Sequence, residues 1–213
     1  MKSLKNFFIL AFICFSLLII TNINVEASCP PGFTQTTVRL TIAGCDYDVE
    51  VCYKCGITYP GEIIINWITE IDSSCNNMLS IEQLIQQAKV EISSAQFIYS
   101  NLCVGGGYQN PPCNEQGTSY AVFTIPHKYC WSDQWMYYFG EMVLRYTPCD
   151  ENAECNETIG YCWKGTGYDK VYSHFTGPQS PPCELEAHEI TIPPYPYGPS
   201  ECFRLLTVPC GIE

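Results

Sequence analysis

The cysteines constrain the fold more than any other feature of this sequence. Of the 15 cysteines among 213 residues, Cys14 lies in an apolar leader and the others follow it. An even number of cysteines in a chain bound for an oxidising compartment predicts that all of them pair. The predicted half-cystines are Cys29, Cys45, Cys52, Cys55, Cys75, Cys103, Cys113, Cys130, Cys149, Cys155, Cys162, Cys183, Cys202 and Cys210. They predict a disulfide-stapled fold, although the sequence leaves their connectivity open.

The leader has the pattern of a secretory signal peptide. Lys2 and Lys5 precede an apolar run over 7–20, and the small residue Ala27 ends a signal-peptidase pattern at 25–27. The run is shorter than the roughly 20 residues that a permanent membrane helix needs. We therefore predict that 1–27 is removed, and that the mature protein is secreted or held at the cell surface without a membrane span.

The charge of the chain argues against two classes of partner. It carries 10 Lys and Arg against 22 Asp and Glu, a net charge of −12 at pH 7. A surface of this sign repels phosphate backbones and anionic lipids. No cluster of basic residues offsets it, so we expect neither nucleic-acid binding nor electrostatic binding to membranes.

Alternation of apolar and polar residues predicts a β-hairpin near the start of the mature chain. Val38, Leu40 and Ile42 alternate with polar residues, and the same period of two returns after a turn, over 47–53. A further strand is predicted over 62–71. The C-x-x-C at 52–55 is interpreted as two half-cystines, because neither a second zinc ligand pair nor a helix start follows it.

Residues 80–99 predict one amphipathic helix. Ser80 and Gln83 fit a capping box, in which each satisfies a backbone amide of the other. Apolar residues then recur at steps of three and four as far as Tyr99, opposite a glutamine-rich face that we expect to be solvated. The predicted fold class is therefore mainly β (α+β) and disulfide-rich, with antiparallel hairpins and one helix near 80–100.

A repeated phrase predicts an internal duplication. Residues 107–113 and 177–183 share Gly, Gln, Pro, Pro and Cys at identical offsets, and each is followed by Thr-Ile-Pro, a Cys-aromatic pair and Pro-Cys. Such self-similarity is typical of repeated units that pack on each other. The predicted segments are an N-terminal hairpin and helix unit over 28–102, β repeat one over 103–149, an acidic disulfide connector over 150–161 and β repeat two over 162–213.

Three further strands are expected within the two repeats. In repeat one they cover 120–125 and 136–146, and the second is apolar on both faces, which predicts that both faces are covered. A closing strand is expected over 203–208 in repeat two.

The predicted connector resembles part of an EGF-like module over about 20 residues. The resemblance lies in the five-residue spacing from Cys149 to Cys155, in Asn152-Ala153, in the Asn-x-Thr-x-Gly-Tyr over 156–161 and in the later Gly-Tyr at 167–168. Cys-Trp-Lys over 162–164 replaces the Cys-x-Cys that closes the EGF pattern, and the acidic calcium motif is absent. We therefore predict a tight disulfide turn without calcium, followed by a glycosylation sequon at 156–158.

Candidate catalytic and metal-binding residues are few. With every cysteine paired, a Cys–His dyad has no thiolate, and neither Gly-x-Ser-x-Gly nor His-Glu-x-x-His occurs. Glu184, Glu186 and His188 would share one face of a strand and could form part of a metal site. The same charges would also keep an edge strand soluble. We expect no cofactor, and an enzyme less than a non-catalytic protein.

Exposed tyrosines are the predicted contact surface. Four prolines over 192–199 favour an extended polyproline-like segment, which keeps Tyr195 and Tyr197 out of the core. Tyrosine combines apolar area with a polar group, which suits protein and glycan partners. The sequence thus predicts a secreted binding, adhesion or cell-surface structural module. An extracellular hydrolase and a secreted inhibitor or effector are the alternatives.

Overall fold

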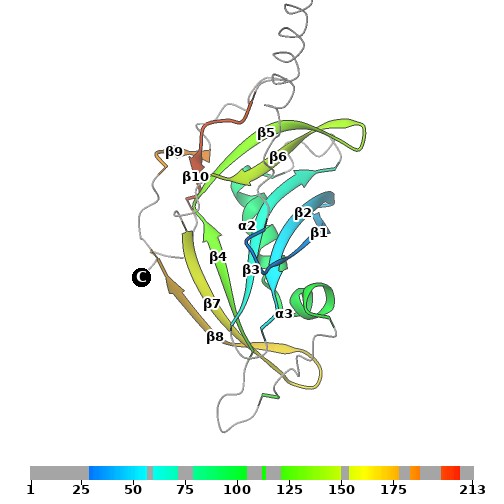
Figure 1. Cartoon of the computed structure of the whole chain (residues 1–213), viewed down its shortest axis with the longest axis vertical. Coiled ribbons are helices and arrows are strands. Elements are labelled where there is room, and N and C mark those ends of the chain that lie inside the picture. Colours follow the sequence, from blue (N-terminus) through cyan, green and yellow to red (C-terminus); the bar gives the residue numbers. More distant parts are fainter. Residues whose placement is uncertain are drawn as a thin grey trace, which may run out of the picture.

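The strands of this protein form one mostly antiparallel sheet, shown in a computed structural model (Figure 1). The structure describes residues 29–56, 60–71, 79–104, 112–113, 121–149, 154–177, 183–187 and 198–206. Within these ranges, ten strands are joined in the order β8-β7-β4-β3-β6-β5-β10-β9, with β1 and β2 added beside β3. The strands are β1 (Thr34–Ile42), β2 (Cys45–Lys54), β3 (Gly61–Glu70), β4 (Ala121–Lys128), β5 (Cys130–Tyr138), β6 (Glu141–Pro148), β7 (Glu154–Trp163), β8 (Tyr168–Thr176), β9 (Leu185–Glu186) and β10 (Phe203–Arg204).

The chain begins with a three-stranded meander. β1 pairs with β2 in antiparallel register from Thr34–Tyr53 to Ile42–Cys45, and β2 pairs in turn with β3. Ala43 and Gly44 connect β1 to β2 with positive φ angles of 52° and 84°. A two-residue turn of this hand matches the twist of antiparallel strands, and glycine takes it without strain.

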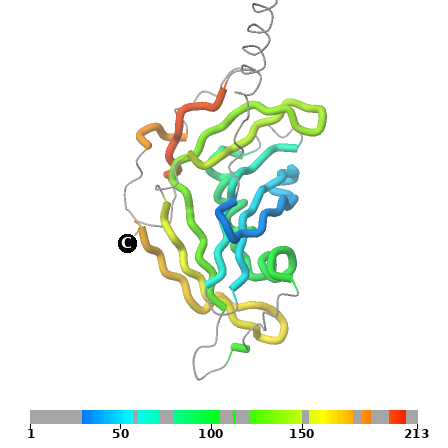
Figure 2. The backbone as a smooth tube through the Cα atoms, in the orientation of Figure 1, coloured from blue at the N-terminus to red at the C-terminus, as the bar shows by residue number. Residues whose placement is uncertain are grey.

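The sheet forks at β3, because two strands share one of its edges. β2 pairs along the other edge of β3 for most of its length. On the shared edge, β4 pairs in parallel with Gly61 and Glu62 only, and β6 pairs in antiparallel fashion with Ile68 and Thr69 only. Residues 63–67 therefore have no described strand on that edge. One branch continues through β4, β7 and β8, and the other through β6, β5, β10 and β9 (Figures 1 and 2).

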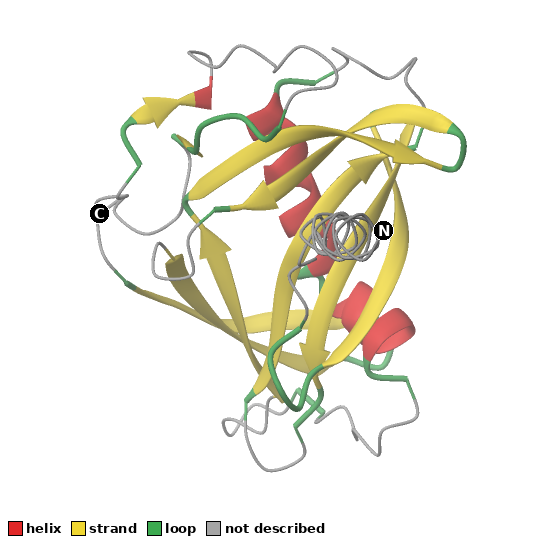
Figure 3. Cartoon of the chain, turned by 45° about the horizontal axis from the view of Figure 1, so that its top comes forward, coloured by secondary structure: helices red, strands yellow, loops and turns green. Residues whose placement is uncertain are grey.

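The helical segments lie behind the strands in the view of Figure 3. Helix α2 (Ile81–Ile92) begins with the predicted capping box: Gln83 N donates to Ser80 Oγ over 3.2 Å, and Ser80 N donates to Gln83 Oε1 over 3.1 Å. The helix is shorter than the pattern over 80–99 predicts. Ser93 and Ser94 interrupt it, and α3 (Ala95–Phe97) and the π-helical turn η2 (Ile98–Leu102) follow. Its apolar stripe packs into the core, which also contains the inner faces of β2, β3 and β4.

A hairpin replaces the single strand that was predicted over 136–146. β5 ends at Tyr138, Phe139 and Gly140 turn the chain with φ angles of 48° and 95°, and β6 starts at Glu141. The prediction that both faces are covered is wrong, because Tyr137 is 70% exposed and Phe139 79% exposed. The two turn residues keep the period of two in phase between β5 and β6. The apolar pattern therefore continues through the turn, and the sequence pattern does not reveal it.

Five disulfides join described cysteines: Cys29–Cys52, Cys55–Cys103, Cys113–Cys162, Cys130–Cys183 and Cys149–Cys202. Cys45 and Cys155 are disulfide-bonded as well. Cys75 and Cys210 lie outside the described residues. The C-x-x-C at 52–55 is indeed two half-cystines, each bonded to a different distant cysteine.

The structure does not confirm the duplication. The equivalent cysteines Cys113 and Cys183 bond to Cys162 and Cys130, so these disulfides run between the two repeats and do not correspond. The single sheet takes strands from every predicted segment. The segment boundaries stay predictions.

The expected disulfide turn at the EGF-like stretch is wrong. β7 occupies most of this stretch and pairs with β4 on one edge and β8 on the other. Cys149 and Cys162 bond to distant cysteines. The alternating burial of Cys155, Glu157 and Ile159 gives the physical reason, since a strand that buries every second residue stays extended.

Two smaller features of the described chain complete the fold. The closing strand predicted over 203–208 is limited to β10: Leu205 and Leu206 are described but lie outside the strand, and 207–208 lie outside the described part. No described helix has the length and apolar character needed to span a membrane.

Candidate functional site

The fork in the sheet creates a cleft of about 640 Å³. β3 contributes Glu62, Ile64 and Asn66, which alternate with core residues and are half-buried. The other lining residues come from the diverging strands, the start of β7, β2 and the N-terminal segment: Pro126, Lys128, Thr147, Pro148, Cys149, Glu154, Cys52, Pro30 and Pro31.

The cleft lies where two ladders stop. If the β3–β4 register continued from Glu62–Thr124, residues 126 and 128 would face 64 and 66. If the β3–β6 register continued from Ile68–Tyr146, residues 147 and 148 would face 67 and 66. Both continuations would require pairing with the same edge of β3. Instead these residues diverge from β3 and become the walls of the cleft.

Two prolines explain why neither ladder closes. Pro126 on β4 and Pro148 on β6 lie at the positions where pairing with β3 would continue. Proline has no N–H to donate and is confined to strand edges. Each still pairs on its other side, Pro126 opposite Asn156 and Pro148 opposite Trp131. The edge of β3 therefore stays available to a different partner.

The polar side chains of the cleft differ in whether they have hydrogen-bond or ion-pair partners. Lys128 forms an ion pair with Glu154, and Asn66 Nδ2 donates to Glu50 Oε1 over 2.5 Å. Glu62 is half-buried and makes no hydrogen bond or ion pair with any described residue. Lys54 lies opposite Glu62 in the β2–β3 pair but forms no ion pair with it, so the cleft offers one carboxylate without a direct partner among the described residues.

The remaining walls are apolar and rigid. Four prolines and Ile64 supply much of the surface, and none of the described lining residues is aromatic. Cys52 and Cys149 also line the cleft, and each is held in a disulfide. Fixed φ angles and covalent crosslinks hold the shape of the cleft before any ligand arrives.

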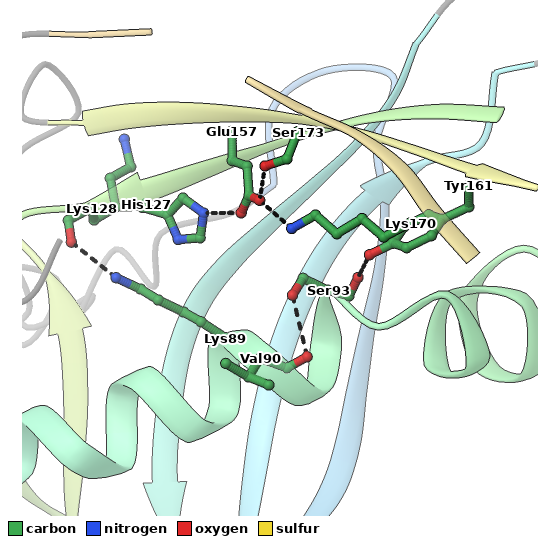
Figure 4. Close-up of polar contacts among 9 residues, drawn as sticks. All are labelled: Lys89, Val90, Ser93, His127, Lys128, Glu157, Tyr161, Lys170 and Ser173. Carbon is green, nitrogen blue, oxygen red and sulfur yellow. Dashed lines mark hydrogen bonds and ion pairs between the residues drawn. The ribbon is translucent and has the colours of Figure 1, made fainter. Parts of the chain in front are cut away.

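A buried polar cluster lies on the other side of β4 (Figure 4). His127 Nε2 lies 2.9 Å from Glu157 Oε2, and Glu157 Oε1 accepts from Lys170 Nζ over 2.6 Å and from Ser173 Oγ over 2.9 Å. Burial by itself would raise the pKa of Glu157, but the bonds from these three residues lower it to about 2. Burial lowers the pKa of His127.

This cluster is a structural network. Ser173 donates to Glu157 and not to His127, so it lacks the nucleophile–base contact of a catalytic triad. His127 and Glu157 are each only 5% exposed, and neither lines the cleft. The cluster ties β8 and β4 to β7, the strand between them.

Lys89 on α2 is the second unusual member of this region. Its side chain is buried, its Nζ donates to the carbonyl oxygen of Lys128 over 3.4 Å, and it lies 5.9 Å from the ring centroid of Trp131. Burial lowers its pKa to about 7. Because the carbonyl belongs to the last residue of β4, this contact supports the wall of the cleft from behind.

Two buried carboxyl groups lie in the other branch of the sheet. Tyr146 Oη donates to Glu70 Oε1 over 3.1 Å, and Asp133 is fully buried opposite Tyr146 on β5. Burial raises the pKa of both carboxyl groups. Neither residue lines the cleft, whose two carboxylates are Glu62 and Glu154, and Glu154 is ion-paired with Lys128.

Of the binding and metal-ligating residues chosen from the sequence, only Glu184 and Glu186 lie in the described part of the chain. Glu184 is exposed, whereas Glu186 on β9 is ion-paired with Arg204 on β10. His188 lies outside the described residues, as do Tyr195 and Tyr197. Among described residues, no three His, Cys, Asp or Glu side chains are grouped closely enough to hold a metal ion.

Exposed aromatic side chains are described at the β5–β6 turn and on β8, where Tyr172 and Phe175 are exposed. Tyr137 and Phe139 point outward, while Tyr138 Oη donates to Asp48 Oδ2 over 2.9 Å and holds the turn against the meander. The cleft itself carries no sequence motif. In the sequence, only the prolines at 126 and 148 indicate that β4 and β6 each leave one edge unpaired.

Comparison with protein-family models, curated proteins and solved structures finds no match to this chain. The function is therefore inferred from the sequence and geometry of the chain itself.

Proposed function

We propose that this chain is a non-catalytic extracellular binding protein that takes its ligand in the cleft of the forked sheet. The disulfide-rich, β-rich fold is compatible with an extracellular protein. A cleft of about 640 Å³ lies within the usual range for ligand sites, about 300–1,000 Å³. The observation that carries the proposal is the carboxylate of Glu62, which has no hydrogen bond or ion pair with a described residue, in a pre-shaped, proline-walled cleft.

A binding role is favoured over the hydrolase because of what lines the cleft. Its charged residues are Glu62 and the Lys128–Glu154 ion pair. The carboxyl groups with raised pKa values, Glu70 and Asp133, are buried elsewhere. Acid–base catalysis needs a group with a shifted pKa within reach of the substrate.

The experiment screens the secreted, oxidised protein against glycan and protein or peptide arrays, and repeats each hit with a blocked cleft. Ile64→Trp adds bulk to the floor of the cleft on a strand that tolerates aromatic residues. Val90→Trp is the matched control, because Val90 is 69% exposed on α2 and does not line the cleft.

We expect Ile64→Trp to weaken binding at least tenfold, about 1.4 kcal/mol. Val90→Trp should bind as the wild type does, and both variants should keep the wild-type melting temperature within a few degrees. Equal binding by the wild type and a folded Ile64→Trp variant would show that the ligand contacts another surface.

A further inference from the structure

We propose that the ligand of the cleft is an extended peptide segment that carries a basic side chain and pairs with the open edge of β3. The inference rests on the proposed binding function and names the class of ligand. Three properties of the cleft support it: a strand edge without a described partner strand, a carboxylate without a hydrogen bond or ion pair to a described residue, and described walls without aromatic residues.

The open edge provides main-chain hydrogen bonds. Residues 63–67 of β3 pair with β2 on one side, apart from Asn66 at a β-bulge, and with no described strand on the other. Five residues of strand span roughly 16 Å at about 3.3 Å per residue. An extended peptide can add to such an edge, gaining affinity from main-chain bonds and specificity from pockets for alternate side chains. Ile65 also lines the cleft although it belongs to the core-facing set of β3, so its main chain borders the open edge.

The charges select a basic side chain. Glu62 lies near the point where β4 leaves β3. Lys54 lies opposite it on β2, but no described residue forms a hydrogen bond or ion pair with its carboxylate. Lys128 is paired with Glu154, so the three charged residues of the cleft leave a net negative charge. The whole chain carries −12, which raises the local concentration of cationic ligands. A lysine or arginine that reaches Glu62 would gain a charge-assisted hydrogen bond in a half-buried site.

Carbohydrate is the less suitable occupant. Aromatic rings supply the flat apolar face and polar edge that suit sugar recognition. None of the described residues that line this cleft is aromatic, and the exposed Tyr137 and Phe139 lie at the β5–β6 turn instead. Prolines form walls that enclose a narrow chain but offer no hydrogen-bond donors from their main chain.

The test is a library of displayed linear heptapeptides, panned against the secreted, oxidised protein. Enriched peptides are synthesised and measured by fluorescence anisotropy against the wild type, Glu62→Gln, Glu91→Gln, Ile64→Trp and Val90→Trp. Glu91 is exposed on α2 and makes a matched control for the loss of one negative charge. N-methylated versions of the best peptide remove its main-chain donors.

We expect lysine or arginine to be enriched at one position of the selected peptides. Glu62→Gln should weaken binding about tenfold and reduce its dependence on salt, since it removes one charge contact. Glu91→Gln should leave affinity unchanged. N-methylation at alternate residues should abolish binding, because the edge of β3 then loses its partner amides.

The outcomes separate the ligand class from the binding site. Peptides that require the cleft but carry no basic residue, or that bind Glu62→Gln normally, overturn the ligand class and leave the proposed function standing. Cleft-dependent binding of a glycan, with no enriched peptide, has the same consequence. Peptides that bind Ile64→Trp as well as they bind Val90→Trp overturn both the ligand class and the proposed site.

Discussion

Replacing the buried Lys89 with methionine should stabilise the protein at neutral pH. Lys89 is only 4% exposed, its amine makes a 3.4 Å hydrogen bond to the carbonyl of Lys128 and lies near the ring of Trp131, and the charge of Glu82 offsets only part of the effect of burial on its pKa. Methionine has a similar unbranched length and fills such space without a charge. The variant therefore removes the free energy that the fold spends to bury an amine.

The magnitude follows from the pKa of the amine in the two states. Burial lowers the pKa of Lys89 from 10.5, its value in an unfolded chain, to about 7. Between these values the unfolded chain binds a proton that the folded chain does not, so wild-type stability rises with pH. Each pH unit well inside this window contributes about 1.4 kcal/mol. From pH 7 to pH 9, the advantage of Lys89→Met over the wild type should shrink by about 2 kcal/mol.

The measurement is guanidinium unfolding at several pH values from 7 to 9, with the disulfides intact and tryptophan fluorescence as the signal. This range lies above the titration of His127, whose pKa burial lowers, and below that of unfolded tyrosines. Lys164→Met is the control, because Lys164 is largely exposed and pairs with Asp169 at the surface. If the wild-type and Lys89→Met curves run parallel across this range, the buried amine is not neutral in the fold.

Three further outcomes are expected from unfolding measurements. Gly61→Ala should destabilise the protein by about 1–3 kcal/mol, because its Cβ would lie 2.5 Å from Phe123 Cδ1. Glu70→Gln should gain stability over the wild type as pH rises above about 4.5, since burial raises the pKa of Glu70 and the fold favours its protonated form. The double change Tyr137→Ala and Phe139→Ala should shift the melting temperature little, because both side chains are largely exposed.

The parts of the fold that depend on near neighbours in sequence were accessible to prediction. The capping box at Ser80 and Gln83 needs only three residues of separation, and the structure shows both of its bonds. The period of two over 38–53 corresponds to β1 and β2. Disulfide formation followed from the even number of cysteines and the leader. The capping box and the alternation are complete within short windows, and the cysteine count requires no knowledge of which residues meet in space.

The fork was not accessible, because it depends on pairings between distant segments. β3 meets β4 and β6 through residues that are about 60 to 80 positions further along the chain. No feature within a short stretch of sequence indicates that β4 and β6 compete for the same edge of β3. The Phe139–Gly140 turn was missed for a different reason: it lacks the Asn-Gly or Asp-Gly signal of two-residue hairpins. Lys89 was missed because its burial comes from the end of β4 and from Trp131, not from the helix pattern.

The disulfides and the cleft are parts of one arrangement. An unpaired strand edge can form main-chain hydrogen bonds with another strand, including one from a second copy of the chain. Here the divergence of β4 and β6 places walls on both sides of the open edge, and Cys52 and Cys149, which line the cleft, are bonded to Cys29 and Cys202. Such crosslinks reduce the entropy that ligand binding would otherwise remove. For the proposed peptide ligand, we expect the same walls to exclude a broad sheet edge and to admit a single extended chain, so that the open edge of β3 does not promote aggregation.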